Sequence, residues 1–314
     1  MKNRVLVTGA TGFVGSNLVR RLVKEGYEVH ILTRKTSNMW RLKDIYSSLI
    51  DHKVDLSDKD DLLNAVTKIN PNNICHLAIY GGYPSQNEDE KILKTNLNGT
   101  INLLSALEGI DYDCFINTGS SSEYGKKEFI MKETDICEPN TVYGIAKLSS
   151  TLYCNHISAK ENKNIGTIRL FSVYGDYEEK GRLIPTLFIN LLNGENVKLG
   201  NPAAVRDFVY IDDVVEAYIS ILKNPEKIKG KIFNISSGNQ ISIGEISEKV
   251  KSILNSSCFL DFGNLSGRTF DSPTWLGDSS LFRETFNWTP KKIDEGLKKS
   301  AEWFSKNLNL YKEV

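Results

Sequence analysis

A glycine-rich stretch near the start of the chain restricts its fold more than any other feature. Residues 8–15 read Thr-Gly-Ala-Thr-Gly-Phe-Val-Gly and directly follow the apolar run Val5–Val7. This order predicts a buried strand, a tight turn at Gly9 and a helix whose free N–H groups can bind a diphosphate. Gly12 would let the backbone approach that group, and Gly15 would let the helix pack against the strand. We therefore expect a dinucleotide to contact Gly9, Thr11, Gly12, Phe13, Val14 and Gly15.

Strand-like and helix-like segments alternate along the first half of the chain. The predicted strands are Arg4–Thr8, Glu28–Leu32, Ile50–Val54, Ile74–Ala78, Cys114–Thr118 and Gly166–Phe171. The predicted helices between them are Val14–Glu25, Leu62–Ile69, Ile92–Leu107 and Val142–Ala159. Such alternation is typical of a parallel sheet with helices on both faces, and right-handed crossovers make the sheet doubly wound. The predicted fold class is therefore α/β, of the Rossmann type.

The alternation weakens after Tyr174, where a charged loop spans residues 176–182. Beyond it, Val205–Val209, Val214–Leu222 and Lys231–Ile235 are still typical of the sheet-bearing domain, whereas the tail from Ile241 onward is not. We expect residues 1–168 and 205–238 to form a dinucleotide-binding domain. Residues 169–204 and 239–314 would form a smaller, discontinuous lobe that binds the substrate across a cleft.

The balance of charges and residue types argues against several kinds of partner. Lys and Arg together number 39, as do Asp and Glu, so the chain offers no basic field for nucleic acid. No apolar run reaches the length of a membrane span, and no signal peptide precedes the glycine strand, so we expect a cytoplasmic protein without a membrane partner. The five cysteines and four histidines lack the spacing of metal ligands, so we expect no metal.

A tyrosine and a lysine suggest acid–base chemistry. Tyr143 and Lys147 lie in a predicted helix, where their spacing places both side chains on one face. A nearby ammonium, like an oxidised nicotinamide, stabilises a phenolate and so lowers the tyrosine pKa from about 10. Tyr143 is therefore a candidate general acid or base at a C–OH or C=O centre. The turn after the strand Cys114–Thr118 brings further hydroxyls, Ser120 among them, to the same edge of the sheet.

These features belong to a longer, ordered set of motifs. After TGATGFVG come TNLNGT at residues 95–100, GSSSEYG at 119–125, YGIAK at 143–147, RLFSVYG at 169–175, RDFVYIDDV at 206–214 and Gly277-Asp278. With this set the chain resembles, over nearly its whole length, the extended short-chain dehydrogenases/reductases that act on nucleotide sugars, the NAD-dependent epimerase/dehydratase family. The resemblance implies a nicotinamide cofactor and a nucleotide-diphosphate sugar as substrate.

The resemblance also implies roles for individual residues. Ser120, Tyr143 and Lys147 would form the catalytic triad. Ser120 would bind the sugar oxygen, Tyr143 would move the proton, and Lys147 would hold the nicotinamide ribose and lower the pKa of Tyr143. Further cofactor contacts would be Asp55, Leu56, Leu77, Ala78 and Asn96. Relatives are usually homodimers through the helices expected at Ile92–Leu107 and Val142–Ala159, and we adopt that as an expectation for this chain.

The end of the second predicted strand bears on the choice between NAD and NADP. An acidic residue there accepts hydrogen bonds from the 2′-hydroxyl of the adenosine ribose, whereas an arginine suits a 2′-phosphate. The strand ends Leu32-Thr33-Arg34-Lys35, with no acid. Arg34 can form a bidentate pair with a phosphate, and Lys35 adds positive charge. The sequence therefore favours NADP(H), with NAD(H) as the alternative if Arg34 is only a solvated loop cation.

The residues around the triad bear on the reaction. The 4,6-dehydratases that the chain resembles carry acidic residues just after the catalytic hydroxyl, where this chain has Ser121 and Ser122. Glu123 lies one position further on and would point elsewhere. With Arg34, this favours an NADPH-dependent reductase of the C4 ketone of a nucleotide-linked 4-keto-6-deoxysugar. The alternatives are an NAD-containing nucleotide-sugar 4-epimerase, a 4,6-dehydratase and, more remotely, a non-catalytic NADP-binding sensor.

A substrate of this kind needs cations for its diphosphate. The resemblance points to Arg206 and Arg268, and Arg182 is a further candidate, although any exposed arginine can instead be a surface charge. Ser121, Ser122 and Tyr80 are expected to contact the sugar. Ser172 stands where relatives commonly have asparagine, which leaves the substrate contacts at that position open.

Overall fold

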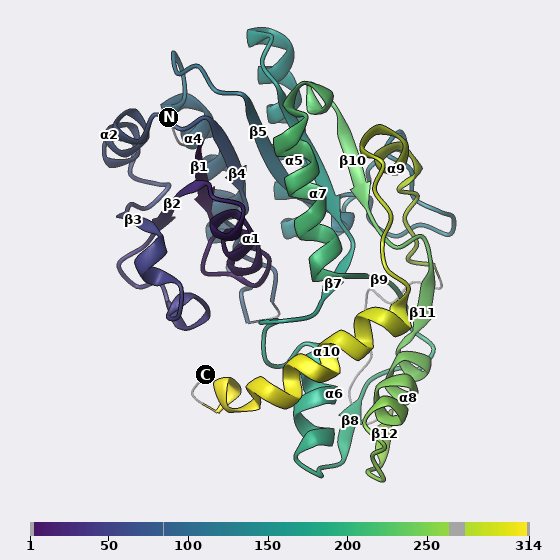
Figure 1. Ribbon diagram of the computed structural model, residues 1–314. Helices are drawn as coiled ribbons and strands as arrows, with labels where there is room; N and C mark the ends of the chain where they lie inside the picture. Colours follow the sequence, from purple (N-terminus) through teal and green to yellow (C-terminus); the bar gives the residue numbers. More distant parts are fainter. Residues whose placement is uncertain (1–2, 84, 264–273, 313–314) are drawn as a thin grey trace.

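The large parallel sheet dominates the computed structural model, which describes residues 3–83, 85–263 and 274–312 (Figure 1). Seven strands pair in the order β10-β6-β5-β4-β1-β2-β3, and every pairing is parallel. Their bounds are β1 Arg4–Thr8, β2 Glu28–Thr33, β3 Ile50–Lys53, β4 Asn73–His76, β5 Cys114–Ser120, β6 Ile165–Leu170 and β10 Ile232–Ile235. The strand order reverses beside β1, as in a doubly wound sheet. The predicted α/β fold class is confirmed.

Helices cover both faces of this sheet because successive strand residues point to opposite sides. Val5 and Val7 belong to a core cluster with α1 (Phe13–Lys24) and α7 (Ile211–Lys223). Leu6 belongs to a second cluster on the other face. That cluster includes residues of α2 (Lys59–Ile69), α4 (Gly99–Ala106) and α5 (Val142–Glu161). The continuous apolar run of β1 is therefore that of a strand buried on both sides.

The helix expected at Ile92–Leu107 is not one regular helix. It consists of α3 (Asp89–Leu93), a π-helical turn (η3, Lys94–Asn98) and α4. The wider turn accompanies the burial of Asn96, whose side-chain amide donates to the carbonyls of Tyr80 at 2.6 Å and Ile92 at 2.9 Å. Such single π turns inside helices are frequent near functional sites.

The second half of the chain adds two small sheets below the large one in Figure 1. One contains β11 (Gln240–Ser242), β9 (Val205–Tyr210) and β7 (Ser172–Tyr174), and the other pairs β12 (Leu260–Phe262) with β8 (Val197–Leu199). Strand β9, expected with the sheet-bearing domain, thus pairs outside the seven-stranded sheet. The division into two domains stays a prediction. The remaining elements are α6 Leu183–Leu192, α8 Ile243–Ile253, α9 Ser280–Phe286, α10 Ile293–Asn307, η1 Trp40–Leu42, η2 Tyr46–Ser48, η4 Ser121–Glu123, η5 Pro225–Ile228 and η6 Leu308–Tyr311.

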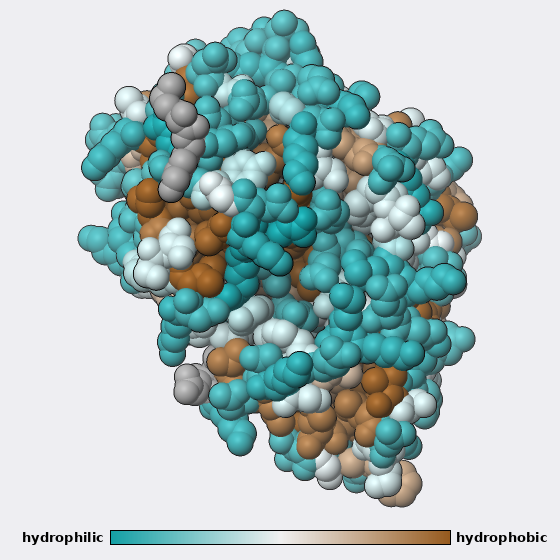
Figure 2. Space-filling view, viewed as in Figure 1, coloured by the Kyte–Doolittle hydropathy of each residue, from teal (hydrophilic) through white to brown (hydrophobic). Residues whose placement is uncertain are grey.

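The surface is mainly hydrophilic on the face that Figure 2 shows, with one apolar area over the upper part and another over the lower part. None of the helices in the described ranges is long and apolar enough to cross a bilayer. Within the same ranges, no three His, Cys, Asp or Glu side chains converge as a metal site.

Candidate active site

A cavity of about 1190 Å³ opens at the carboxyl ends of the parallel strands. The glycine turn, the ends of β2 and β5, the segment after β4 and the start of α5 line it from the large sheet. The segment 178–184 and residues near β8 and β9 line it from the second half of the chain. In open α/β sheets this edge is where ligands bind. The volume exceeds that of a typical single-ligand pocket, which leaves room for a dinucleotide and a second nucleotide together.

The glycine turn has the geometry that its sequence predicts. Gly9 has a φ of +70°, and a Cβ there would lie 2.5 Å from the carbonyl carbon of Leu77. A Cβ on Gly15 would lie 2.2 Å from the Gly9 oxygen, so only glycine lets α1 pack this close. Gly12 is the N-cap of α1, and no side chain caps the helix. The N–H groups of its first turn are therefore available to a phosphate.

The segment beyond β4 is held against the turn by an oriented network. The Thr8 hydroxyl accepts from the backbone N–H groups of Leu77 at 3.2 Å and Ala78 at 3.1 Å, so it donates to His76 Nδ1 at 2.7 Å. His76 Nε2 then donates to the Thr100 hydroxyl at 2.9 Å. Burial lowers the pKa of His76 to about 3, so the ring is neutral and keeps this tautomer. His76 is thus a structural histidine.

Arg34, Asp55 and Leu56 line one end of the cavity, whereas Lys35 does not. Arg34 is exposed directly after β2. Burial raises the pKa of Asp55, but hydrogen bonds from Ser57 and the charge of Arg34 outweigh it, so the pKa lies below its ordinary value. A cation and a carboxylate therefore face the place expected for the adenosine of a dinucleotide.

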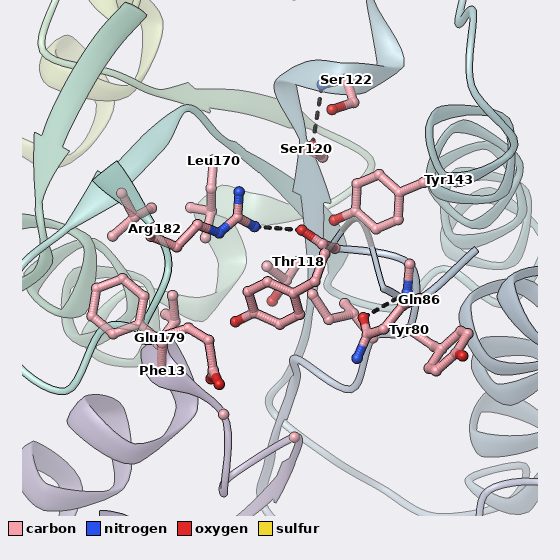
Figure 3. Close-up of a pocket in the computed structure, with 18 of the residues that line it drawn as sticks. Phe13, Tyr80, Gln86, Thr118, Ser120, Ser122, Tyr143, Leu170, Glu179 and Arg182 are labelled. Carbon is pink, nitrogen blue, oxygen red and sulfur yellow. Dashed lines mark hydrogen bonds between the residues drawn. The ribbon is translucent and has the colours of Figure 1, made fainter. Parts of the chain in front are cut away.

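Ser120 and Tyr143 meet at the other end of the cavity (Figure 3). Ser120 is the last residue of β5, which extends two residues beyond the predicted strand. Tyr143 lies in the first turn of α5, where Thr141 caps the helix by accepting from Gly144 N at 3.0 Å. Both side chains line the cavity, and the Ser120 hydroxyl lies near enough to act on the pKa of the phenol. A sugar hydroxyl placed here would meet a phenol and a hydroxyl at once.

Burial raises the pKa of Tyr143 to about 12, while the nearby Ser120 hydroxyl and the charge of Arg182 act to lower it. The phenol is therefore protonated at neutral pH, and it needs a further positive charge in the site to act as a base. Lys147 is 1% exposed, and burial lowers its pKa. Its ammonium forms no hydrogen bond or ion pair with any residue in the described ranges. A buried ammonium with unused donors fits the ribose hydroxyls of a nicotinamide nucleotide.

Glu123 points away from the cavity, as the sequence suggested. Its carboxylate accepts from Ser120 N at 2.8 Å, Thr151 Oγ1 at 3.0 Å and Arg169 Nε at 2.8 Å, and both charged side chains are buried. This carboxylate holds the turn after β5 in place. Ser121 and Ser122 both line the cavity beside Ser120, and Ser121 is largely buried. No acidic side chain of this turn is available for dehydratase chemistry.

The other predicted contacts are placed as follows. Tyr80, Arg182 and Arg206 line the cavity. The Tyr80 hydroxyl donates to Glu88 Oε1 at 2.6 Å, and Arg206 lies over the Trp275 ring at 5.6 Å. Asn96 does not line the cavity, and Arg268 lies outside the described residues.

Several lining residues escaped sequence reasoning. They are Gln86, Glu178, Glu179, Trp275 and the stretch from Lys198 to Asn201. Glu178 and Glu179 lie in the charged loop 176–182, and this was the only feature of the sequence that drew attention to them. Charged loops are ordinarily exposed to solvent, so the sequence did not predict that they line a cavity. The fold carries this loop over the cavity, and its position depends on contacts distant in the sequence.

Comparison with known proteins assigns the chain to a family. The sequence model of the NAD dependent epimerase/dehydratase family matches residues 5–236. The chain belongs to this family. Its members are nucleotide-sugar enzymes, which confirms the predicted resemblance and enzyme class.

Individual family members are similar along the whole chain. A putative UDP-glucose 4-epimerase of Methanocaldococcus jannaschii is 26% identical over 96% of this chain and 99% of its own. The solved UDP-glucose 4-epimerase of Thermotoga maritima, with UDP-glucose, has a TM-score of 0.88 at 26% identity and covers 97% and 99% of the two chains. The UDP-glucuronic acid 4-epimerase of Bacillus cereus, with UDP-glucuronic acid and NAD, has a TM-score of 0.85 at 25% identity and covers 96% and 99%.

Proposed function

We propose that this family member is a nucleotide-sugar 4-epimerase, which inverts C4 of a hexose attached to a nucleoside diphosphate. The observation that carries the proposal is that Ser120 and Tyr143 line the same end of the cavity, while Glu123, the carboxylate of that turn, is turned away to Arg169. The phenol and the hydroxyl can remove and return the proton of one sugar hydroxyl, whereas the turn after β5 offers no carboxylate for elimination. The similar proteins described above are named as 4-epimerases, which favours inversion over net reduction.

Each residue of the site would have its own role in this reaction. A bound nicotinamide supplies the hydride acceptor and donor. Tyr143 takes the proton of the C4 hydroxyl and later returns it. Ser120 hydrogen-bonds the same oxygen and orients it. Lys147 holds the nicotinamide ribose through its unused donors, and the N-terminus of α1 holds the cofactor diphosphate.

Inversion requires that both faces of the sugar reach the same cofactor. The hexose must therefore turn while the nucleoside diphosphate stays bound. Arg206, beside Trp275, is suited to hold the diphosphate and to lie near a base. The substrate lobe would thus anchor the nucleotide and leave the sugar free to rotate at Tyr143.

A second candidate rests on Arg34. An exposed guanidinium at the end of β2, with no acid at the same place, favours NADPH and hence net reduction of a 4-keto-6-deoxysugar. An epimerase regenerates its cofactor in each cycle, whereas a reductase consumes it. This difference separates the two candidates.

The test therefore follows product and cofactor together. Purified protein is supplied with NAD⁺ and incubated with UDP-, CDP-, GDP- and dTDP-linked glucose, N-acetylglucosamine and glucuronic acid, and C4 epimers are separated by chromatography. The epimerase predicts a C4 epimer of at least one sugar with no net change in absorbance at the nicotinamide wavelength. Oxidation of added NADPH by a nucleotide 4-keto-6-deoxysugar, with no epimer from any simple sugar, would instead support the reductase.

A further inference from the structure

Arg182 carries a positive charge into the catalytic end of the cavity. It is the N-cap of α6, and Figure 3 shows its side chain extending toward Tyr143. Its guanidinium donates to the carbonyl of Gly82 and lies over the ring of Tyr83, 4.7 Å from the ring centre. Both partners belong to the segment after β4 that also brings Tyr80 and Gln86 to the cavity. Arg182 therefore spans the cavity from the second half of the chain to the first.

No carboxylate in the described ranges pairs with Arg182. The two acidic residues nearest to it in its own loop, Glu178 and Glu179, do not neutralise its charge. Glu179 pairs with Arg41 at 2.6 Å. Burial raises the pKa of Glu178 to about 8, so that this carboxyl is mainly uncharged at neutral pH. A half-buried guanidinium bound only to a carbonyl and a ring retains most of its charge for a ligand.

The position of this charge relative to the sugar follows from the proposed function, on which this step rests. If Tyr143 acts at C4, the diphosphate is attached across the pyranose ring, at C1. The C6 group is attached at C5, directly next to C4. Arg182 is close enough to Tyr143 for its charge to act on the phenol. A cation at this place lies beside C4 and within reach of the group that C5 carries, whereas Arg206 lies on the nucleotide side, near Trp275.

We propose that Arg182 binds a carboxylate at C6, so that the substrate is a nucleotide-linked uronic acid. The planar guanidinium matches a carboxylate in two parallel hydrogen bonds. On binding, it would exchange the Gly82 carbonyl for the stronger, charged acceptor. Ser122, which also lines the cavity, would add a hydroxyl at the sugar. The assignment differs from the sequence expectation, which gave Arg182 to the diphosphate.

The test compares two sugars that differ only at C6. The nucleoside diphosphate that binds best among UDP, CDP, GDP, ADP and dTDP is found first by calorimetry with NAD-loaded protein. Its glucose and glucuronic acid conjugates are then titrated into the wild type and into Arg182→Met, whose fold is checked by thermal melting. We expect the wild type to bind the uronic acid at least about 10-fold more tightly. In Arg182→Met the uronic acid should lose about 10- to 100-fold in affinity, and the glucose conjugate less than about 3-fold.

Two further variants make the result specific. Arg206→Met should weaken both conjugates equally, because the diphosphate is common to them. Arg182→Lys should recover only part of the uronic acid affinity, because lysine keeps the charge but cannot donate two parallel hydrogen bonds from one planar group. Equal losses for both conjugates in Arg182→Met would place Arg182 at the diphosphate and overturn the proposal. A wild type that prefers glucose would overturn it as well.

The binding result and the proposed function can fail separately. Preferential, Arg182-dependent binding of the uronic acid without any C4 inversion would overturn the 4-epimerase and leave the ligand of Arg182 assigned. Inversion of C4 in the glucose conjugate, without a preference for the uronic acid, would support the epimerase and overturn the role of Arg182.

Discussion

At the residue scale, the proposed reaction depends first on the phenol of Tyr143. Replacement of Tyr143 by phenylalanine removes the proton carrier but keeps the ring, so α5 should pack unchanged. We expect turnover to fall at least about 100-fold, the usual contribution of a positioned acid–base group. Binding of NAD, followed by fluorescence quenching, should stay within about 2-fold of wild type. Full turnover in this variant would show that another group moves the proton.

A second prediction at this scale concerns Glu178. Burial raises its pKa from an ordinary 4.5 to about 8, so the folded chain binds this proton more tightly than the unfolded chain. The group therefore stabilises the fold below about pH 4.5, and its contribution is lost as the pH rises through about 8. In the wild type this loss should lower the melting temperature as the pH rises from about 4.5 to about 8. Glu178→Gln should make that decrease smaller. The exposed Glu248→Gln should leave the decline unchanged, and an unchanged decline in Glu178→Gln would contradict the burial of an uncharged carboxyl.

The sequence predicts some residues of the site better than others. Ser120 and Tyr143 were predictable because a strand end and a helical turn place them from local sequence alone. The orientation of Glu123 followed from its position one residue beyond the serines. Asn96 shows the limit: its motif suggested a cofactor contact, but its amide is used within the fold, by Tyr80 and Ile92. Whether a polar side chain faces a ligand or a neighbouring loop depends on packing that a motif does not describe.

At the element scale, Arg41 joins the glycine turn to the loop that carries Arg182. The buried guanidinium donates to Thr11 O at 3.3 Å, Tyr177 O at 2.8 Å and Glu179 Oε2 at 2.6 Å. Tyr177 has a φ of +65°, a conformation that a tyrosine adopts only when its surroundings hold it. Arg41 therefore fixes the loop in a conformation that it would not adopt alone.

Removal of this link should loosen the loop and destabilise the fold. We expect Arg41→Met to lower the free energy of unfolding by about 2–3 kcal/mol in urea, because charged hydrogen bonds to buried acceptors are lost. It should also raise the KM for the nucleotide sugar, since the loop lines the cavity. The control is Arg21→Met, which removes ion pairs with Glu25 and Glu216 at the surface and should cost at most about 1 kcal/mol. Equal effects of the two variants would contradict a linking role for Arg41.

The elements themselves were largely predictable. The pattern of apolar residues predicts most helices and the strands of the large sheet, because the inner strands are buried on both faces; the edge strand β3 is half exposed. The π-helical turn at Lys94–Asn98 was not predictable, since its cause is the bond between Asn96 and a loop that is distant in sequence. The extension of β5 to Ser120 also depends on pairing, as Ser120 lies beside Leu170 of β6.

At the scale of the whole molecule, α5 carries an exposed apolar face. Ile145 is 46% exposed and Leu152, two turns later, is 58% exposed, with Leu93 of α3 also exposed. We expect this face to join two copies of the chain, as the family resemblance implied. Leu152→Glu should convert a dimer into a monomer in size-exclusion chromatography with light scattering.

The matched control for this surface is Leu281→Glu, which places the same charge on α9, at a leucine that is 41% exposed. It should leave the oligomeric state unchanged. A monomeric wild type, or a Leu152→Glu variant that remains dimeric, would contradict dimerisation through α5.

The architecture of the whole chain was predictable only in part. The glycine turn and the alternation of strands and helices suffice for the doubly wound sheet. The small sheets were not predictable, because β7 and β11 have only three residues each and β9 pairs with them across long stretches of sequence. Their pairing brings Arg206 and the loop of Arg182 over the carboxyl ends of the large sheet, and so completes the cavity.

In the proposed reaction, Tyr143 and Ser120 serve a hydride transfer at C4 that is reversed on the opposite face of the sugar. The most direct measurement is proton NMR of the nucleotide sugar that the protein binds best, incubated in D₂O with a catalytic amount of NAD⁺. We expect the C4 epimer to accumulate with its hydrogen at C4 retained, because the hydrogen returns as a hydride and never exchanges with solvent. Deuterium at C4, or no epimer while the sugar is bound, would contradict it.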